Sequence, residues 1–115
     1  MSKTVYRTVL TFVRPDVTVD FFPTTPVMES KKSEYRDSGK ILGYYGANSD
    51  DGLSRTYTVD FINVEAKNEF RGLPEVDAVM QDLLQYNDDN AIVTSSEEVE
   101  VVTTQYDWLW YCLMI

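Results

Sequence analysis

The most informative feature of this sequence is what it lacks: none of its 115 residues is a histidine. Histidine is the commonest general base near neutral pH and a frequent ligand of zinc and haem. Its absence excludes Ser–His–Asp and Cys–His catalysis. Cysteine is nearly absent as well, because Cys112 is the single thiol, so no intrachain disulfide forms. Cys112 lies within "WYCLM", which favours a small buried side chain over a reactive thiol.

Positive charge is also scarce. Ten Lys plus Arg against nineteen Asp plus Glu give a net charge of −9. This charge opposes binding to phosphate backbones and to anionic membranes, so we expect no nucleic acid and no membrane as partners. We interpret the charge mainly as an aid to solubility.

Long hydrophobic runs are absent too. The longest, at 108–115, has eight residues, whereas a membrane-spanning helix needs about twenty. The start of the chain, "MSKTVYRTVL", goes straight into an alternating pattern and shows no signal-peptide core. These features predict a cytoplasmic protein.

The length fits one domain over 1–115. Residues 5–13 predict a strand that is apolar on both faces, as a central strand would be. Residues 17–26 extend it or form an apolar loop. Thr25 and Pro26 begin a helix over 26–38, which Gly39 ends in a left-handed conformation. Residues 40–61 predict a hairpin around "NSDDG", with a bulge or a close backbone approach at its strand glycines.

The second half of the chain continues the pattern. Asn63 caps a short helix that ends at Gly72, and Pro74 begins another whose apolar spacing over 76–84 packs on a core. Residues 87–90, "NDDN", predict a turn, followed by strand character near 91–94 and 98–106. The order is therefore β-α-β-β-α-β, followed by a hydrophobic arm over 106–115.

This order predicts an α+β, ferredoxin-like antiparallel sheet. Four stretches, "YRTVLTFV", "SGKILGYYGANSDDGLSRTYTVDF", "NVEAKNEFRGLPEVDAVMQDLL" and "EEVEVVTTQY", make the chain resemble the dimeric α+β barrel proteins. That group includes the antibiotic-biosynthesis monooxygenases. The resemblance is one of topology. It implies helices on one sheet face, a second protomer on the other, and a C-terminal segment that crosses over.

The terminal arm "YDWLWYCLMI" fits that picture. Exposed to water, it would form a large apolar patch. We therefore predict a homodimer in which Trp108, Trp110, Leu113 and Ile115 lie in the interface, because aromatic residues are enriched at such contacts. A core strand of a monomer and a contact with another protein are the alternatives.

Candidate chemistry is sparse. The acidic stretches "SDDG" and "NDDN" are explained by turn formation, so we predict no metal site. Glu97, Glu98 and Glu100 fit exposed strand positions. Tyrosines in the hairpin, Tyr44, Tyr45 and Tyr57, together with Trp108, are candidates for lining a ligand pocket. Tyrosine is also a common strand residue, so sheet packing is the alternative.

Three functions remain open. The first is a self-associating accessory or binding protein without catalysis, of a kind found in bacteria and bacteriophages. The second, implied by the resemblance, is a monooxygenase that acts on aromatic substrates without metal or flavin. The third is a barrel that binds a small apolar ligand without turnover. We favour the first and expect no cofactor. A deep pocket with a convergent polar group would favour the other two.

Overall fold

The fold is taken from a computed structural model, which describes residues 3–103. The elements run in the predicted order: β1 (Lys3–Val13), α1 (Pro26–Asp37), β2 (Ile41–Asn48), β3 (Ser54–Phe61), α2 (Val64–Gly72), α3 (Pro74–Asp89) and β4 (Val93–Thr103). No helix within these residues is both long enough and apolar enough to cross a membrane.

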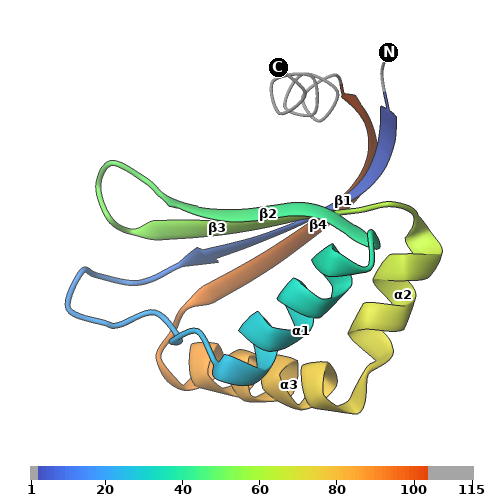
Figure 1. Cartoon of the computed structure of the whole chain (residues 1–115). Coiled ribbons are helices and arrows are strands. Elements are labelled where there is room, and N and C mark those ends of the chain that lie inside the picture. Colours follow the sequence, from blue (N-terminus) through green and yellow to red (C-terminus); the bar gives the residue numbers. More distant parts are fainter. Residues whose placement is uncertain (1–2, 104–115) are drawn as a thin grey trace.

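The strands form one antiparallel sheet in the order β2-β3-β1-β4, and all three helices lie on the same side of it (Figure 1). β1 is central, as its two apolar faces predicted. The register pairs Leu10 with Tyr57 on β3 and with Ser96 on β4, so these residues point to one side. That side faces the helices, and the ferredoxin-like α+β prediction is confirmed.

Local signals place the helices as expected. The Thr25 side chain caps α1 by accepting a hydrogen bond from the Met28 amide at 3.2 Å, with Pro26 in the first turn. Gly39 follows the helix with a φ of 80°, a conformation that favours glycine. Asn63 caps α2 in the same manner, through the Ala66 amide at 2.8 Å.

Both glycines of the β2 hairpin strand have a structural cause. The register slips between Ile41 and Gly43, which is the predicted bulge. A side chain at position 46 would begin 3.3 Å from the Tyr57 ring, so Gly46 allows that ring to lie against the neighbouring strand.

The core lies between the sheet and the helices in two clusters. One centres on Phe61, Phe70 and Val76, and the other on Phe12, Phe21 and Ile92. Leu84, which belongs to the apolar spacing over 76–84 that was predicted to pack on the core, is instead 46% exposed on α3.

The predicted turn at 87–90 was wrong. α3 continues to Asp89, because Asn87 is buried and its side-chain amide donates to the Thr94 hydroxyl at 2.9 Å. The chain turns just beyond, where Ala91 has a φ of 57°.

The break predicted between 94 and 98 was also wrong. Ser95, Ser96 and Glu97 pair with Thr11, Leu10 and Val9, so β4 is continuous. Pairing along a full central strand outweighs the weak strand preference of serine and glutamate. The arm over 106–115, with its predicted interface residues Trp108, Trp110, Leu113 and Ile115, lies outside the described residues.

Candidate functional site: an apolar cavity between the sheet and the helices

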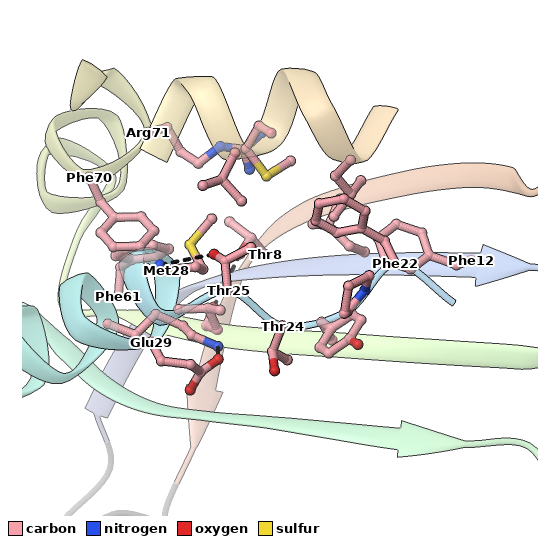
Figure 2. Close-up of a pocket in the computed structure, with 18 residues that line it drawn as sticks. Thr8, Phe12, Phe22, Thr24, Thr25, Met28, Glu29, Phe61, Phe70 and Arg71 are labelled. Carbon is pink, nitrogen blue, oxygen red and sulfur yellow. Dashed lines mark hydrogen bonds and ion pairs between the residues drawn. The ribbon is translucent and has the colours of Figure 1, made fainter. Parts of the chain in front are cut away.

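A cavity of about 110 Å³ lies between the helix-facing side of the sheet and helices α1 and α3 (Figure 2). Its walls are apolar. Strands β1 and β3 contribute Leu10, Phe12 and Val59, while the helices contribute Met28, Val79 and Leu83. The alternation of strand side chains explains the placement, because β1 residues of even number and β3 residues of odd number face the helices.

The connection between β1 and α1 covers the cavity on one side. Residues 22–25 line it, and Figure 2 labels Phe22, Thr24 and Thr25 there. The Tyr86 hydroxyl donates to the Asp20 carbonyl at 2.6 Å, and the Tyr86 ring meets Phe22 edge-on with centroids 5.5 Å apart. The covering segment is therefore attached to α3.

The same segment is held to the sheet by two arginines. The guanidinium carbons of Arg14 and Arg55 lie 4.5 Å and 4.6 Å from the centroid of the Phe21 ring. Arg14 also donates to the Val19 carbonyl and to the Gly52 carbonyl, at 2.9 Å and 2.8 Å. Cation–π contacts of this kind stabilise by about 0.5–1 kcal/mol at exposed sites and more where water is excluded.

Few charged groups reach the cavity. Glu29 and Lys32, on successive turns of α1, line it but pair with one another at 2.8 Å. The Lys32 ammonium also lies 4.7 Å from the centroid of the Tyr44 ring. Arg71, at the end of α2, is the other charged residue of the lining.

A polar cluster borders this region on the sheet. The Tyr6 hydroxyl donates to one Glu98 oxygen at 2.7 Å, and Lys67 pairs with the other oxygen at 2.7 Å. The hydrogen bonds from Lys67 and Tyr6, with a smaller effect of the Arg71 charge, lower the pKa of Glu98. Glu98 is thus an anion held in an ion pair and not simply a solvated strand residue.

A second cluster is structural. Burial and a hydrogen bond to Glu69 raise the pKa of Tyr35 to about 12. Lys40 pairs with the same carboxylate at 2.9 Å. The Tyr35 phenol therefore stays protonated at neutral pH and lies away from the cavity lining.

The tyrosines singled out from the sequence are dispersed. Tyr57 lines the cavity, with its ring centroid 5.6 Å from that of Phe12. Tyr44 packs against the core cluster beside Lys32. Tyr45 is exposed on the opposite face of the sheet, where it pairs with Thr58, and Trp108 lies outside the described residues.

Sequence reasoning missed the residues that shape the cavity. Arg71 follows Phe70 in a short helix, and only the rotation of that helix against the sheet brings its side chain to the lining. Within residues 3–103, no three His, Cys, Asp or Glu side chains come together as metal ligands would.

The face of the sheet opposite the helices carries a different arrangement. Arg7 on β1 donates two hydrogen bonds to Asp60 on β3, from Nε to Oδ1 at 2.7 Å and from Nη2 to Oδ2 at 2.9 Å. Four apolar side chains on this face, Val13, Tyr45, Val93 and Val99, are exposed to 42%, 55%, 66% and 43%. This face therefore combines a buried ion pair with apolar surface.

Known proteins resemble this chain in fold alone. No family profile and no curated protein matches it. A conserved protein of unknown function from Bacteroides thetaiotaomicron, described as a possible oxidoreductase, is 8% identical; the match covers 86% of this chain and 98% of that one, with a TM-score of 0.57. A protein from Shewanella oneidensis is 11% identical over 89% of this chain and 98% of its own, with a TM-score of 0.56.

A third structure carries a functional description. It comes from Deinococcus radiodurans, is described as a candidate antibiotic biosynthesis monooxygenase, and is 10% identical over 84% of this chain and 91% of its own, with a TM-score of 0.55. The chain thus has the fold of the antibiotic-biosynthesis-monooxygenase-like, dimeric α+β barrel proteins.

Proposed function

We propose that this protein is a self-associating binding protein that takes up a small apolar molecule in the cavity beneath the β1–α1 connection, without turning it over. The observation that carries the proposal is the cavity itself, which is lined by apolar side chains such as Leu10, Val79 and Leu83. Desolvating an apolar ligand there is favourable by about 25 cal/mol for each Å² removed from water.

The size of the cavity limits the ligand. At about 110 Å³ it is smaller than an engineered apolar cavity of about 150 Å³ that binds benzene. A single ring or a short branched chain therefore fits after a small adjustment, and Met28 and Met80 in the lining can supply it because methionine repacks readily. A multi-ring substrate needs a pocket in the range of about 300–1,000 Å³.

Binding can be tested with benzene as the probe. We expect benzene to shift the backbone amide NMR signals of residues around Leu10 and Leu83 in the full chain. Leu83→Trp fills the cavity and is expected to weaken binding by about tenfold or more, the change that corresponds to the loss of about 1.4 kcal/mol.

The matched control is Leu84→Trp, because the neighbouring Leu84 is exposed on the same helix and does not line the cavity. It should bind benzene as the unchanged protein does. Two results would contradict the proposal: no change in the NMR signals when benzene is added to the unchanged protein, or equally large changes in Leu83→Trp.

An oxygenase is the second candidate, and the fold of the Deinococcus radiodurans protein supports it. The same preparations discriminate between the two functions when oxygen consumption is followed with an anthrone or a quinol. For a binding protein we expect no uptake above the buffer rate. Uptake that depends on the cavity, and that Leu83→Trp abolishes, would favour the oxygenase.

Self-association is the other part of the proposal. The resemblance to dimeric α+β barrel proteins implies that the helix-free face pairs with a second copy. Exposed Val13 and Val93, which pair across β1 and β4, support it, because exposed apolar surface can mark interaction sites.

A further inference from the structure

Building on the proposed function, we infer that the ligand of the cavity carries a carboxylate and that Arg71 binds it. The chemical class is a small monocarboxylate with a compact apolar body, such as a single ring or a branched chain. The inference stands on one feature, a guanidinium that lines an apolar cavity and lacks an anionic partner among residues 3–103.

Arg71 lies in the last turn of α2 and is half-buried. Figure 2 shows its side chain extending from the end of that helix over the cavity, on the side of α3. Within the described chain it forms no ion pair and donates no hydrogen bond. A charge that loses water without gaining a partner is costly, so an anion that enters the cavity would relieve that cost.

Most other cations near the helices already have partners. Lys31, Lys32, Lys40 and Lys67 each pair with a glutamate at distances from 2.7 to 3.4 Å. The protein has almost twice as many acidic as basic residues. Arg71 therefore differs from these lysines in that no glutamate within residues 3–103 neutralises its charge at the cavity lining.

Glu98 is an acidic group that feels the Arg71 charge, which contributes to lowering its pKa, but both of its oxygens are already occupied. One of its oxygens accepts from Tyr6 and the other pairs with Lys67, both at 2.7 Å. Glu98 therefore reduces the local positive potential without supplying Arg71 with a bidentate partner.

The other charges of the lining cancel. Glu29 and Lys32 form a pair at 2.8 Å, so together they add little net charge. The cavity thus combines apolar walls for the body of a ligand with one uncompensated cation. The planar guanidinium fork matches a carboxylate through two parallel hydrogen bonds, which is why we infer this anion.

The test compares two ligands of nearly the same shape, benzoate and benzamide, by calorimetric titration of the full chain. A charge-assisted pair is about twice as strong as a neutral one, so we expect benzoate to bind about tenfold more tightly than benzamide. In Arg71→Gln this preference should fall to about twofold or less, because the amide of glutamine lacks the charge.

Arg36→Gln is the matched control. Arg36 lies exposed in the last turn of α1, outside the cavity lining, and the substitution removes the same charge from the whole protein. It should keep the preference for benzoate. Equal affinities for the two ligands in the unchanged protein, or a preference that persists in Arg71→Gln, would overturn the inference.

Benzene separates this inference from the proposed function. If benzene binds but benzoate binds no more tightly than benzamide, only the inference about Arg71 is contradicted. If none of the three ligands binds, the cavity is not a binding site and the proposed function fails with the inference. Benzene binding by Arg71→Gln would also show that the variant is folded.

Discussion

At the residue scale, the Arg7–Asp60 pair is a polar contact of the sheet that is fixed at two points. Its two hydrogen bonds join neighbouring strands on the helix-free face, and the Asp60 side chain is only 1% exposed, against 22% for Arg7. The planar guanidinium satisfies both carboxylate oxygens at once. A buried carboxylate held in this way depends strongly on its partner.

We expect Asp60→Asn to lower the free energy of unfolding by about 3 kcal/mol, because it removes the charge of the carboxylate that accepts both Arg7 hydrogen bonds. Urea unfolding at neutral pH measures this loss. The double variant Arg7→Met/Asp60→Asn should lose less than the sum of the two single variants, since neither half of the pair then remains alone.

The control is Lys31→Gln, which removes surface pairs with Glu34 and Glu75 and should lower the free energy of unfolding far less than Asp60→Asn does. If Asp60→Asn and Lys31→Gln lower the free energy of unfolding by equally small amounts, the Arg7–Asp60 pair does not contribute to stability as expected.

Neither Arg71 nor the Arg7–Asp60 pair was predictable from the sequence. Both depend on contacts between elements: the pair on the register of β1 against β3, and Arg71 on the orientation of α2. Tyr57 was named from the sequence only as one of several hairpin tyrosines. Alternation along β3 brings Tyr57 to the helix-facing side, whereas the register of β2 against β3 pairs Tyr45 with Thr58 on the opposite face.

At the element scale, two glycines end helices in different ways. Gly39, just beyond α1, has a φ of 80°, whereas Gly72 is the last residue of α2 and is not among the positive-φ residues. A side chain built at either position meets nothing within 4 Å. Backbone conformation is therefore the main difference between the two sites.

This difference predicts opposite effects of the same substitution. Gly39→Ala should destabilise the fold by about 1 kcal/mol, because an L-residue is strained in the left-handed region. Gly72→Ala should be neutral or stabilising by up to about 1 kcal/mol, because alanine restricts the unfolded chain and favours helix. Thermal unfolding followed by circular dichroism would measure both, and the same sign for the two would contradict the assignment of the α1 terminus.

Element boundaries were predictable where a local signal defines them. The caps at Thr25 and Asn63 and the stop at Gly39 involve residues within three positions of one another, so the sequence alone specifies them. The end of α3 was not predictable. The burial of Asn87 against Thr94 is a tertiary contact, and it overrides the turn preference of "NDDN".

At the scale of the whole molecule, the sheet has helices on one face only (Figure 1). On the other face, the end of β1 and β4 that carries Val13 and Val93 is exposed, while the end that carries Val5 is buried. A second copy applied to the exposed part would remove this apolar surface from water, which is the driving force we assign to self-association.

We expect Val99→Lys to weaken the proposed dimer, because it places a charge on the helix-free face of the edge strand β4, beside Arg7 of β1. Sedimentation of the full chain should show a shift from dimer toward monomer. Val102→Lys is the matched control: Val102 lies on the same strand, is 69% exposed and points to the opposite side, so its dimer should persist.

A full chain that sediments as a monomer at all concentrations would contradict self-association. If the dimer is unchanged in Val99→Lys, the helix-free face is not the interface, and the two copies associate through another surface.

The overall topology was predictable because alternation, caps and turn signals recur through most of the chain and agree with one another. The cavity was not, since its walls come from two strands, three helices and a connection that the sequence left open between strand and loop. Its shape depends on packing, which no single stretch encodes.

The Phe21 ring, lying between the two guanidinium groups, has a kinetic consequence. The connection that covers the cavity must swing outward for a ligand to pass, and each opening would break both of these contacts as well as the Tyr86–Asp20 bond. Entry and escape would then proceed at the rate of this opening and not at the rate of diffusion. Trimming the Phe21 ring to leucine should hasten exchange while leaving the affinity nearly as it was.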